Sequence, residues 1–201
     1  MLFSDTYLTI EKPAEIIFKD KGSKFLTYAY PVQNEQQIKD ILTQLKKEHH
    51  TANHHCYAYR LGADKQNYRA NDDGEPSNTA GKPILGQIQS NDLTDIFIVV
   101  VRYFGGTLLG VSGLINAYKT SAAEVIKACS IIEKQILFHY TVRFPFEQLN
   151  EVMKLLKQLD GKILKQDFDN QCEIQFNIRK ANSEACEEKL KKINELTLEY
   201  K

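Results

Sequence analysis

Hydrophobic residues in the first two thirds of the chain follow both the twofold period of strands and the 3.6-residue period of helices. Residues 96–101, IFIVVV, are apolar without interruption, which predicts a central strand buried on both faces. Residues 54–61 predict a second strand with alternating faces. One of its faces carries His54, Cys56, Ala58 and Arg60. Strand-like segments on either side of the turn at Lys21-Gly22 predict a hairpin.

Helices are predicted where apolar side chains recur on one helical face. The first follows Asn34, a typical N-cap residue with Gln37 as its capping-box partner, and ends near His49. A short apolar helix is expected over residues 84–89, after a loop that contains glycine and proline. Another helix is expected from Leu114 onward, with apolar residues at 114, 118, 122, 125 and 129.

From about residue 136 the pattern predicts a separate β-α-β-β-α-β unit. Apolar residues alternate over 138–144, 172–178 and 196–200, and helical stripes lie between these segments. We therefore expect an α+β protein. It would consist of an α/β sandwich in residues 1–135 and a second domain in residues 136–201.

Charge and cysteine content narrow the class of protein. Lys+Arg and Asp+Glu are balanced at 26 each, so a nucleic-acid contact would need a local basic patch. The first residues show no leader pattern, no apolar run is as long as a membrane span, and the four cysteines are scattered. We expect a cytoplasmic protein with reduced, mostly buried thiols, no membrane contact and no cofactor.

A glycine-rich segment follows the apolar strand and precedes a helix. The free N–H groups at a helix N-terminus favour anions, and Ser112 is well placed to cap this helix. Arg102, at the end of the strand, could donate to a phosphate or carboxylate. The spacing of Gly105, Gly106 and Gly110 matches no nucleotide-binding motif. The alternative is that the glycines allow a tight turn and Arg102 pairs with a buried acid.

The segment NDDGEPSN gathers Asp72, Asp73 and Glu75 around a glycine. These carboxylates could bind a divalent cation, act as a general base, or pair with Arg102. An Asp-Gly turn with solvated charges is the plain alternative.

Histidines at 49, 50, 54 and 55 lie near Cys56, but no second Cys or His cluster completes a zinc site, so we expect no bound metal. His54 and Arg60 share one strand face and could line a pocket. The segment GVSG at 110–113 falls short of a hydrolase elbow.

Several segments carry a resemblance to a known family. They are KGSKF, HHCYAYRLG, NDDGEPSNTAGKPIL and VVVRYFGGTLLGVSGLINAYKTSA. These segments resemble the signature blocks of the bacterial YigZ family, whose N-terminal domain is shared with the eukaryotic translation regulator Impact. The resemblance implies a ribosomal protein S5 domain 2-like fold followed by a ferredoxin-like domain, a pairing that is similar to part of the ribosomal translocase elongation factor G. It also implies contact with RNA or the ribosome.

Our leading hypothesis is a non-catalytic cytoplasmic factor that binds RNA or the ribosome and modulates translation. The anion-binding surface would comprise Lys24, Arg60, Lys82, Arg102, Gly105, Gly106, Gly110, Ser112 and Lys119. Asp73 and Glu75 would hold Arg102 in place or form one side of the groove.

Two alternatives remain open. One is an enzyme acting on a phosphorylated or nucleotide-like small molecule, with His54, Asp73, Glu75 and Arg102 as the catalytic candidates. The other is a protein-interaction module, for which an exposed apolar patch would be the signature. The sequence does not determine the oligomeric state.

Overall fold

The structure is a computed structural model that describes residues 5–169 and 171–200. It is a mixed α+β protein with antiparallel sheets. The chain forms two compact units, Tyr7–Lys134 and Gln135–Lys201, the second of which includes the residues before Tyr7. Two short strands, β1 (Thr6–Ile10) and β7 (Ile131–Gln135), pair with each other. No helix in the described part of the chain is long and apolar enough to cross a membrane.

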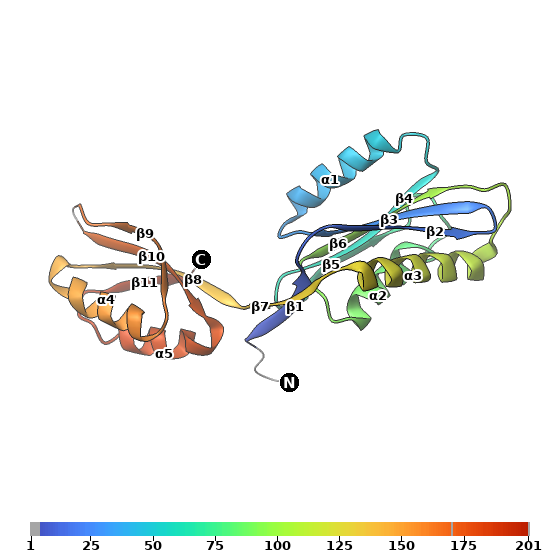
Figure 1. The fold of residues 1–201 in the computed structure, drawn as a ribbon. Helices are drawn as coiled ribbons and strands as arrows, with labels where there is room; N and C mark the ends of the chain where they lie inside the picture. Colours follow the sequence, from blue (N-terminus) through green and yellow to red (C-terminus); the bar gives the residue numbers. More distant parts are fainter. Residues whose placement is uncertain (1–4, 170, 201) are drawn as a thin grey trace. The chain divides into compact units, whose positions relative to one another are not determined.

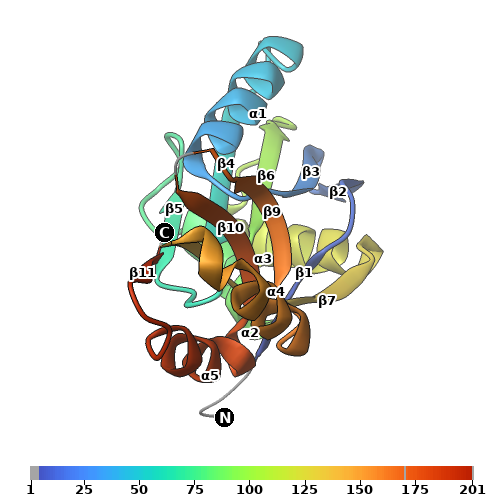
Figure 2. The same ribbon diagram turned by 90° about the vertical axis from the view of Figure 1, so that its left-hand side faces the viewer.

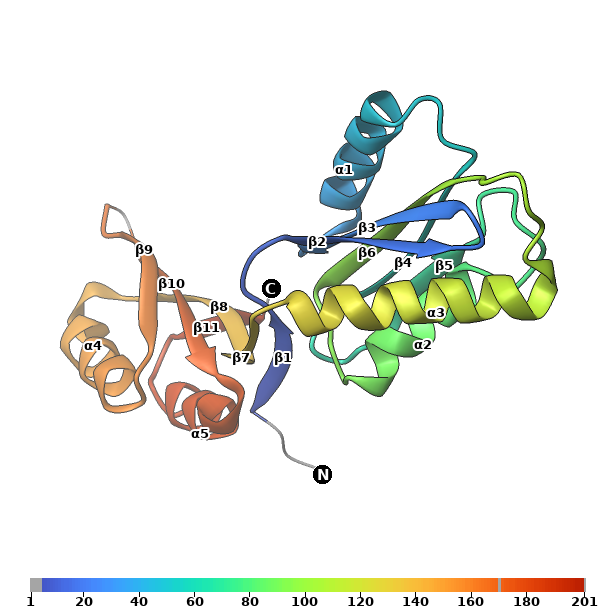
Figure 3. The same ribbon diagram turned by 45° about the vertical axis from the view of Figure 1, so that its right-hand side comes forward.

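The unit Tyr7–Lys134 is built on a five-stranded antiparallel sheet in the order β2-β3-β6-β4-β5. Its strands are β2 (Ala14–Asp20), β3 (Ser23–Pro31), β4 (His54–Leu61), β5 (Asn67–Asn71) and β6 (Ile96–Tyr103). Its helices are α1 (Glu35–Glu48), α2 (Gly81–Ser90) and α3 (Gly110–Ala128). Helix α1 covers one face of the sheet, and α2 and α3 cover the other (Figure 1). Figure 3 shows α3 running along its face of the sheet.

The position of β6 confirms the prediction from its uninterrupted apolar run. It lies in the middle of the sheet, and its residues Ile96–Arg102 are all buried. Ile96, Ile98 and Val100 pack with α2 and α3, whereas Phe97, Val99 and Val101 pack on the α1 side. Strand β4 alternates as expected, with Cys56 and Ala58 on the α2/α3 side and Tyr59 and Leu61 on the α1 side.

The N-cap residue and the apolar periodicity predicted the bounds of α1 correctly. The Asn34 side chain accepts a hydrogen bond from the Gln37 N–H at 3.0 Å, and α1 ends at Glu48. The side chain of Gln37 accepts from the Gln33 N–H at 2.7 Å, one residue before the N-cap. The Asn34 half of the capping box therefore forms as expected, whereas Gln37 accepts from the N–H of Gln33 instead of from that of Asn34.

Several elements differ from the prediction. Strand β7 was not predicted, and helix α2 begins at Gly81, three residues before the expected start at Ile84. Strand β5 was not predicted because it is an edge strand, NYRAN, with no buried residue and hence no apolar alternation. Helix α3 begins at Gly110, one turn before the expected Leu114. Glycine is a weak helix former, so the sequence pattern gave no signal for this first turn.

The second unit has the predicted β-α-β-β-α-β order. Its elements are β8 (Leu137–Phe144), α4 (Leu149–Gln158), β9 (Lys162–Asp167), β10 (Cys172–Arg179), α5 (Lys180–Leu190) and β11 (Thr197–Tyr200). A 3-10 turn, Phe146–Gln148, precedes α4. The strands form an antiparallel sheet in the order β11-β8-β10-β9, with α4 and α5 on one face (Figure 2). The core lies between that face and the helices.

Candidate functional site

A buried ion pair between Glu75 and Arg102 is the centre of the candidate site. The Arg102 Nη1 atom lies 2.6 Å from Glu75 Oε1, and the Tyr118 hydroxyl donates to the same oxygen at 2.8 Å. Glu75 is 9% exposed and Arg102 is 5% exposed. Arg102 stands near the end of β6, and Glu75 lies in the loop before α2. The sequence left two alternatives for Arg102, binding of an anion and pairing with a buried acid. In the structure Arg102 pairs with a buried acid, Glu75.

Sheet register explains the position of Arg102. Phe25 on β3 and His54 on β4 are its direct neighbours across the sheet, so the three side chains share the α2/α3 face. The guanidinium carbon lies 5.6 Å from the Phe25 ring centroid and 5.8 Å from that of Phe104. Nη2 lies 3.3 Å from Ser23 Oγ, and Nε has no partner in the described structure. Aromatic and hydrogen-bonding contacts thus fix the arginine in place.

The three carboxylates of the acidic turn have different roles. Asp72 accepts hydrogen bonds from the N–H groups of Ala80 (3.0 Å) and Gly81 (2.8 Å), and so caps α2. Asp73 accepts from the His55 N–H at 2.7 Å and pairs with Lys46 at 3.3 Å. Among the described residues only Glu75 forms an ion pair with Arg102, so Asp73 does not hold Arg102 in place.

His54 is oriented by the same turn. Its Nδ1 lies 2.8 Å from the Asp73 carbonyl oxygen, which can only accept, so Nδ1 carries the proton. Its Nε2 lies 3.8 Å from Glu75 Oε1. The turn includes Gly74, whose φ of +89° is a backbone conformation that favours glycine. The ring therefore presents Nε2 as a proton acceptor beside the Glu75 carboxylate.

A pocket of 430 Å³ opens beside these groups. It is lined by Asn53, His54, Glu75, Pro76, Arg102, Phe104, Leu108, Leu109, Gly110, Val111 and Leu114. The volume is in the range of small-molecule sites. The pocket combines an apolar wall from the loop 104–109 and the start of α3 with a polar end formed by His54, Glu75 and Arg102.

The glycine-rich loop is shaped mainly by close packing. A Cβ on Gly105 would lie 1.9 Å from the Gly22 carbonyl carbon, so these two backbones touch. Gly106 and Gly110 have φ of +86° and +71°, with open space around their Cα atoms. Ser112 does not cap α3, because the helix begins two residues earlier and Leu109 occupies the N-cap position.

The five cations expected to form one surface are not brought together. Arg60 is buried at the opposite end of β4 from His54, where it pairs with Asp92 at 3.3 Å. Lys24 faces the α1 side of the sheet, whereas Lys82 and Lys119 are exposed on α2 and α3. Arg102 alone lines the pocket.

The sequence alone did not identify two polar members of the site. Tyr118 falls in the apolar stripe of α3, and only its hydroxyl distinguished it from a core residue. Cys56 Sγ lies 3.3 Å from that hydroxyl and 3.0 Å from the Asp72 carbonyl oxygen. Burial raises the pKa of both groups, so the Cys56 thiol and the Tyr118 hydroxyl stay protonated. Among residues 5–169 and 171–200, no group of three or more His, Cys, Asp and Glu side chains is arranged to hold a metal ion.

Comparison with known proteins assigns the family. The sequence pattern of the Impact N-terminal domain matches residues 21–126. The chain is 36% identical to the Escherichia coli "IMPACT family member YigZ" over 82% of this chain and 81% of that protein. The chain belongs to the IMPACT family. It is also 34% identical to the Bacillus subtilis family member YvyE, over 77% of this chain and 74% of that protein.

The family match includes every residue of the pocket, which lies between Asn53 and Leu114. A crystal structure of a hypothetical protein has a TM-score of 0.76 and 32% identity, and the alignment covers 98% of this chain and 97% of that one. The IMPACT-family pattern and the pocket therefore coincide in the first unit.

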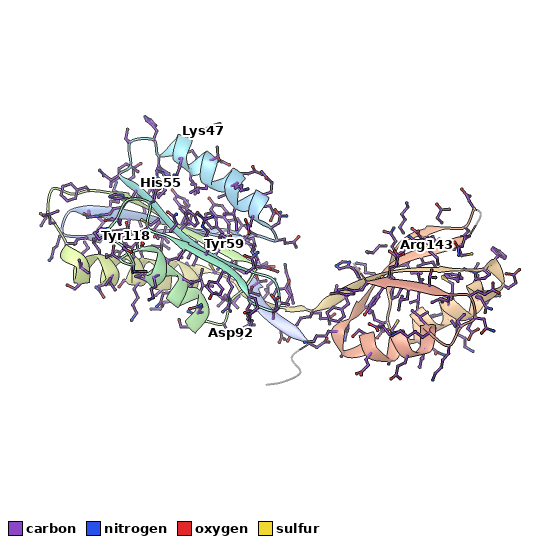
Figure 4. All side chains as sticks on the ribbon, turned by 180° about the vertical axis from the view of Figure 1, so that it is seen from behind. Lys47, His55, Tyr59, Asp92, Tyr118 and Arg143 are labelled. Carbon is purple, nitrogen blue, oxygen red and sulfur yellow. The ribbon has the colours of Figure 1, made fainter. Side chains whose placement is uncertain are left out.

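His55, next to the site, predicts a pH dependence of stability. It is 7% exposed between β4 and α1, and its Nε2 has no partner among the described residues; Figure 4 shows it on the side of the sheet opposite Tyr118. Burial lowers the pKa of His55 below 6.5, and Lys46 and His49 lower it further, whereas Asp73, at 3.9 Å, opposes the shift. Because the unfolded chain binds the proton more readily, stability is lost as the pH falls through about 6.5.

His55→Gln is expected to remove this part of the pH dependence. Urea unfolding of both proteins at pH 7.5 and pH 5 tests the expectation. An unchanged difference in unfolding free energy between the two pH values would contradict it.

Proposed function

We propose that this IMPACT-family protein is a non-catalytic cytoplasmic regulator of translation that binds a protein partner of the ribosome through the pocket and its apolar rim. One observation carries the proposal: Phe104, Leu108, Val111 and Ile115 are all exposed, and Leu108 is 83% exposed. Val111 and Ile115 are one turn apart on α3, so they lie on one helical face. Exposed apolar groups that gather around a pocket are typical of protein-binding surfaces.

The distribution of charge favours a protein over RNA as the partner. Arg60 and Arg102 are buried in ion pairs, and Lys24 and Lys119 lie on opposite sides of the sheet. The formal net charge is zero. Phosphate binding depends on clustered cations, and the five cations expected to form one surface are not gathered on one face.

The proposal includes a fold assignment for each unit, one based on topology and one on resemblance. We assign the second unit to the ferredoxin-like class because its β-α-β-β-α-β order gives the sheet order β11-β8-β10-β9. We assign the first unit to the S5 domain 2-like class on its resemblance. The same pair of domains in the ribosomal translocase supports a role at the ribosome by analogy.

His54 supports an enzyme as the second candidate. Its Nε2 is positioned as a proton acceptor at the polar end of the pocket, where Arg102 could orient a phosphorylated or nucleotide-like substrate. The lining residues include no serine, threonine or cysteine, so the groups of the pocket that could take part in a reaction are His54, Glu75 and Arg102.

Co-sedimentation with purified ribosomes at low and high salt tests the proposal. Leu108→Ser is expected to weaken association about tenfold, equivalent to roughly 1.4 kcal/mol. Ile17→Ser is the matched control, because Ile17 is 62% exposed on β2 and lies outside the pocket. The contact should persist at high salt, since it is mainly apolar.

Binding that fades with salt and is unchanged in Leu108→Ser would indicate RNA phosphates as the partner and would contradict a protein contact at the rim. Equal losses in Leu108→Ser and Ile17→Ser would show that the effect is not specific to the pocket.

A further inference from the structure

Glu75 has an unused acceptor atom at the pocket. Its Oε1 atom accepts from Arg102 at 2.6 Å and from the Tyr118 hydroxyl at 2.8 Å. Its Oε2 atom accepts no hydrogen bond from residues 5–169 and 171–200, yet it is not one of their fully buried unpartnered atoms, so solvent reaches it. The side chain is 4% exposed and lines the pocket. A buried carboxylate oxygen without a donor is uncommon, and a donor would reach this one from the pocket.

His54 adds a second acceptor at the same end of the pocket. Its Nδ1 donates to the Asp73 carbonyl oxygen at 2.8 Å, so Nε2 carries a lone pair. Nε2 lies 3.8 Å from Glu75 Oε1, and both residues line the pocket. The Arg102 guanidinium is already held by Glu75 and Ser23. The polar end of the pocket is therefore suited to a ligand that donates a hydrogen bond, and an anion would face two acceptors there.

Charge and apolar area limit the kind of donor. The Glu75 carboxylate and the Arg102 guanidinium neutralise each other at 2.6 Å, so an ammonium group beside Glu75 would also be repelled by Arg102. A neutral donor meets no such repulsion. Most of the remaining lining is apolar and consists of Pro76, Phe104, Leu108, Leu109, Val111 and Leu114. A large apolar body that carries one neutral donor matches both features of the pocket.

We propose that the pocket binds the indole side chain of a tryptophan from the protein partner. The ring would pack on Phe104, Leu109 and Leu114, and its N–H would donate to Glu75 Oε2. Indole only donates, whereas a phenol would also bring oxygen lone pairs next to the two acceptors. Tryptophan is among the residues that most often anchor protein interfaces, and this chain contains none, so the anchor would come from another protein. The inference rests on the proposed function and specifies which side chain of the partner enters the pocket.

Binding of two indole probes to the full chain tests the inference. The probes are N-acetyltryptophanamide and its analogue methylated on the indole nitrogen, which keeps the ring and lacks the donor. Because the chain has no tryptophan, all indole fluorescence comes from the probe, and a fluorescence titration gives its affinity. We expect the methylated probe to bind about tenfold more weakly, the effect of losing one hydrogen bond to a charged acceptor.

Glu75→Gln and Phe104→Leu form a matched pair of variants. In Glu75→Gln the amide oxygen can still accept from Arg102 and Tyr118, which turns the NH₂ group toward the pocket and replaces an acceptor by donors. The difference in affinity between the two probes should therefore disappear. Phe104→Leu keeps the carboxylate and removes an aromatic ring from the apolar wall. It should weaken both probes and retain the tenfold difference.

Equal affinity of the two probes for the unsubstituted chain would overturn the hydrogen bond to Glu75 and the tryptophan assignment with it. A difference that persists in Glu75→Gln would mean that the added methyl group clashes, and would overturn the assignment as well. Displacement of the indole by n-butylammonium at lower concentration than by N-acetylphenylalaninamide would overturn it in favour of a cationic side chain. If neither indole probe binds, the inference fails. The proposed function is judged separately, by the ribosome association of Leu108→Ser.

Discussion

Glu75→Leu is expected to lower the free energy of unfolding of the first unit by about 3–5 kcal/mol. The substitution leaves the Arg102 guanidinium buried without its carboxylate at 2.6 Å and removes the acceptor of the Tyr118 hydroxyl. A buried charge without a partner is much more costly than a buried pair. Urea unfolding followed by circular dichroism measures the loss, and amide exchange in α3 assigns it to this unit.

The double variant Glu75→Leu with Arg102→Met is the control for this prediction. It removes both charges, and apolar replacement of a buried pair is often neutral or stabilising. We therefore expect the double variant to be more stable than Glu75→Leu alone. A double variant as unstable as the single one would mean that the loss comes from packing rather than from the unpaired arginine.

Gly105→Ala is expected to destabilise the first unit by about 3 kcal/mol, the upper part of the usual range for overpacking. The added Cβ would lie 1.9 Å from the carbonyl carbon and 2.1 Å from the carbonyl oxygen of Gly22, and neither backbone atom can move aside like a side chain. The contact joins the β2–β3 turn to the loop that leads into α3. The midpoint of urea unfolding measures the effect.

Gly106→Ala provides a comparison in the same loop. A Cβ at Gly106 meets nothing within 4 Å, but φ is +86°, so the cost is conformational and about 1 kcal/mol. A loss for Gly105→Ala no larger than that for Gly106→Ala would show that the Gly105–Gly22 approach relaxes without cost.

The sequence by itself determined those strands and helices that a pattern of neighbouring apolar and polar residues predicts. The uninterrupted apolar run placed β6 at the centre of its sheet, and alternation assigned the two faces of β4. These patterns succeed because every strand has a twofold side-chain period and burial selects residue type on each face. The sequence also singled out His54, Glu75 and Arg102, which meet in one pocket.

Only the tertiary structure decided how these residues pair. Glu75, rather than Asp73, reaches Arg102 across 27 positions of the sequence, and Tyr118 joins it from 43 positions away. The approach of Gly105 to Gly22 likewise joins separate loops. Such contacts depend on sheet register and on the paths of loops, which local periodicity does not encode. The apolar pattern therefore predicts which face a residue occupies, whereas its partner across the sheet is known only once the strands are aligned.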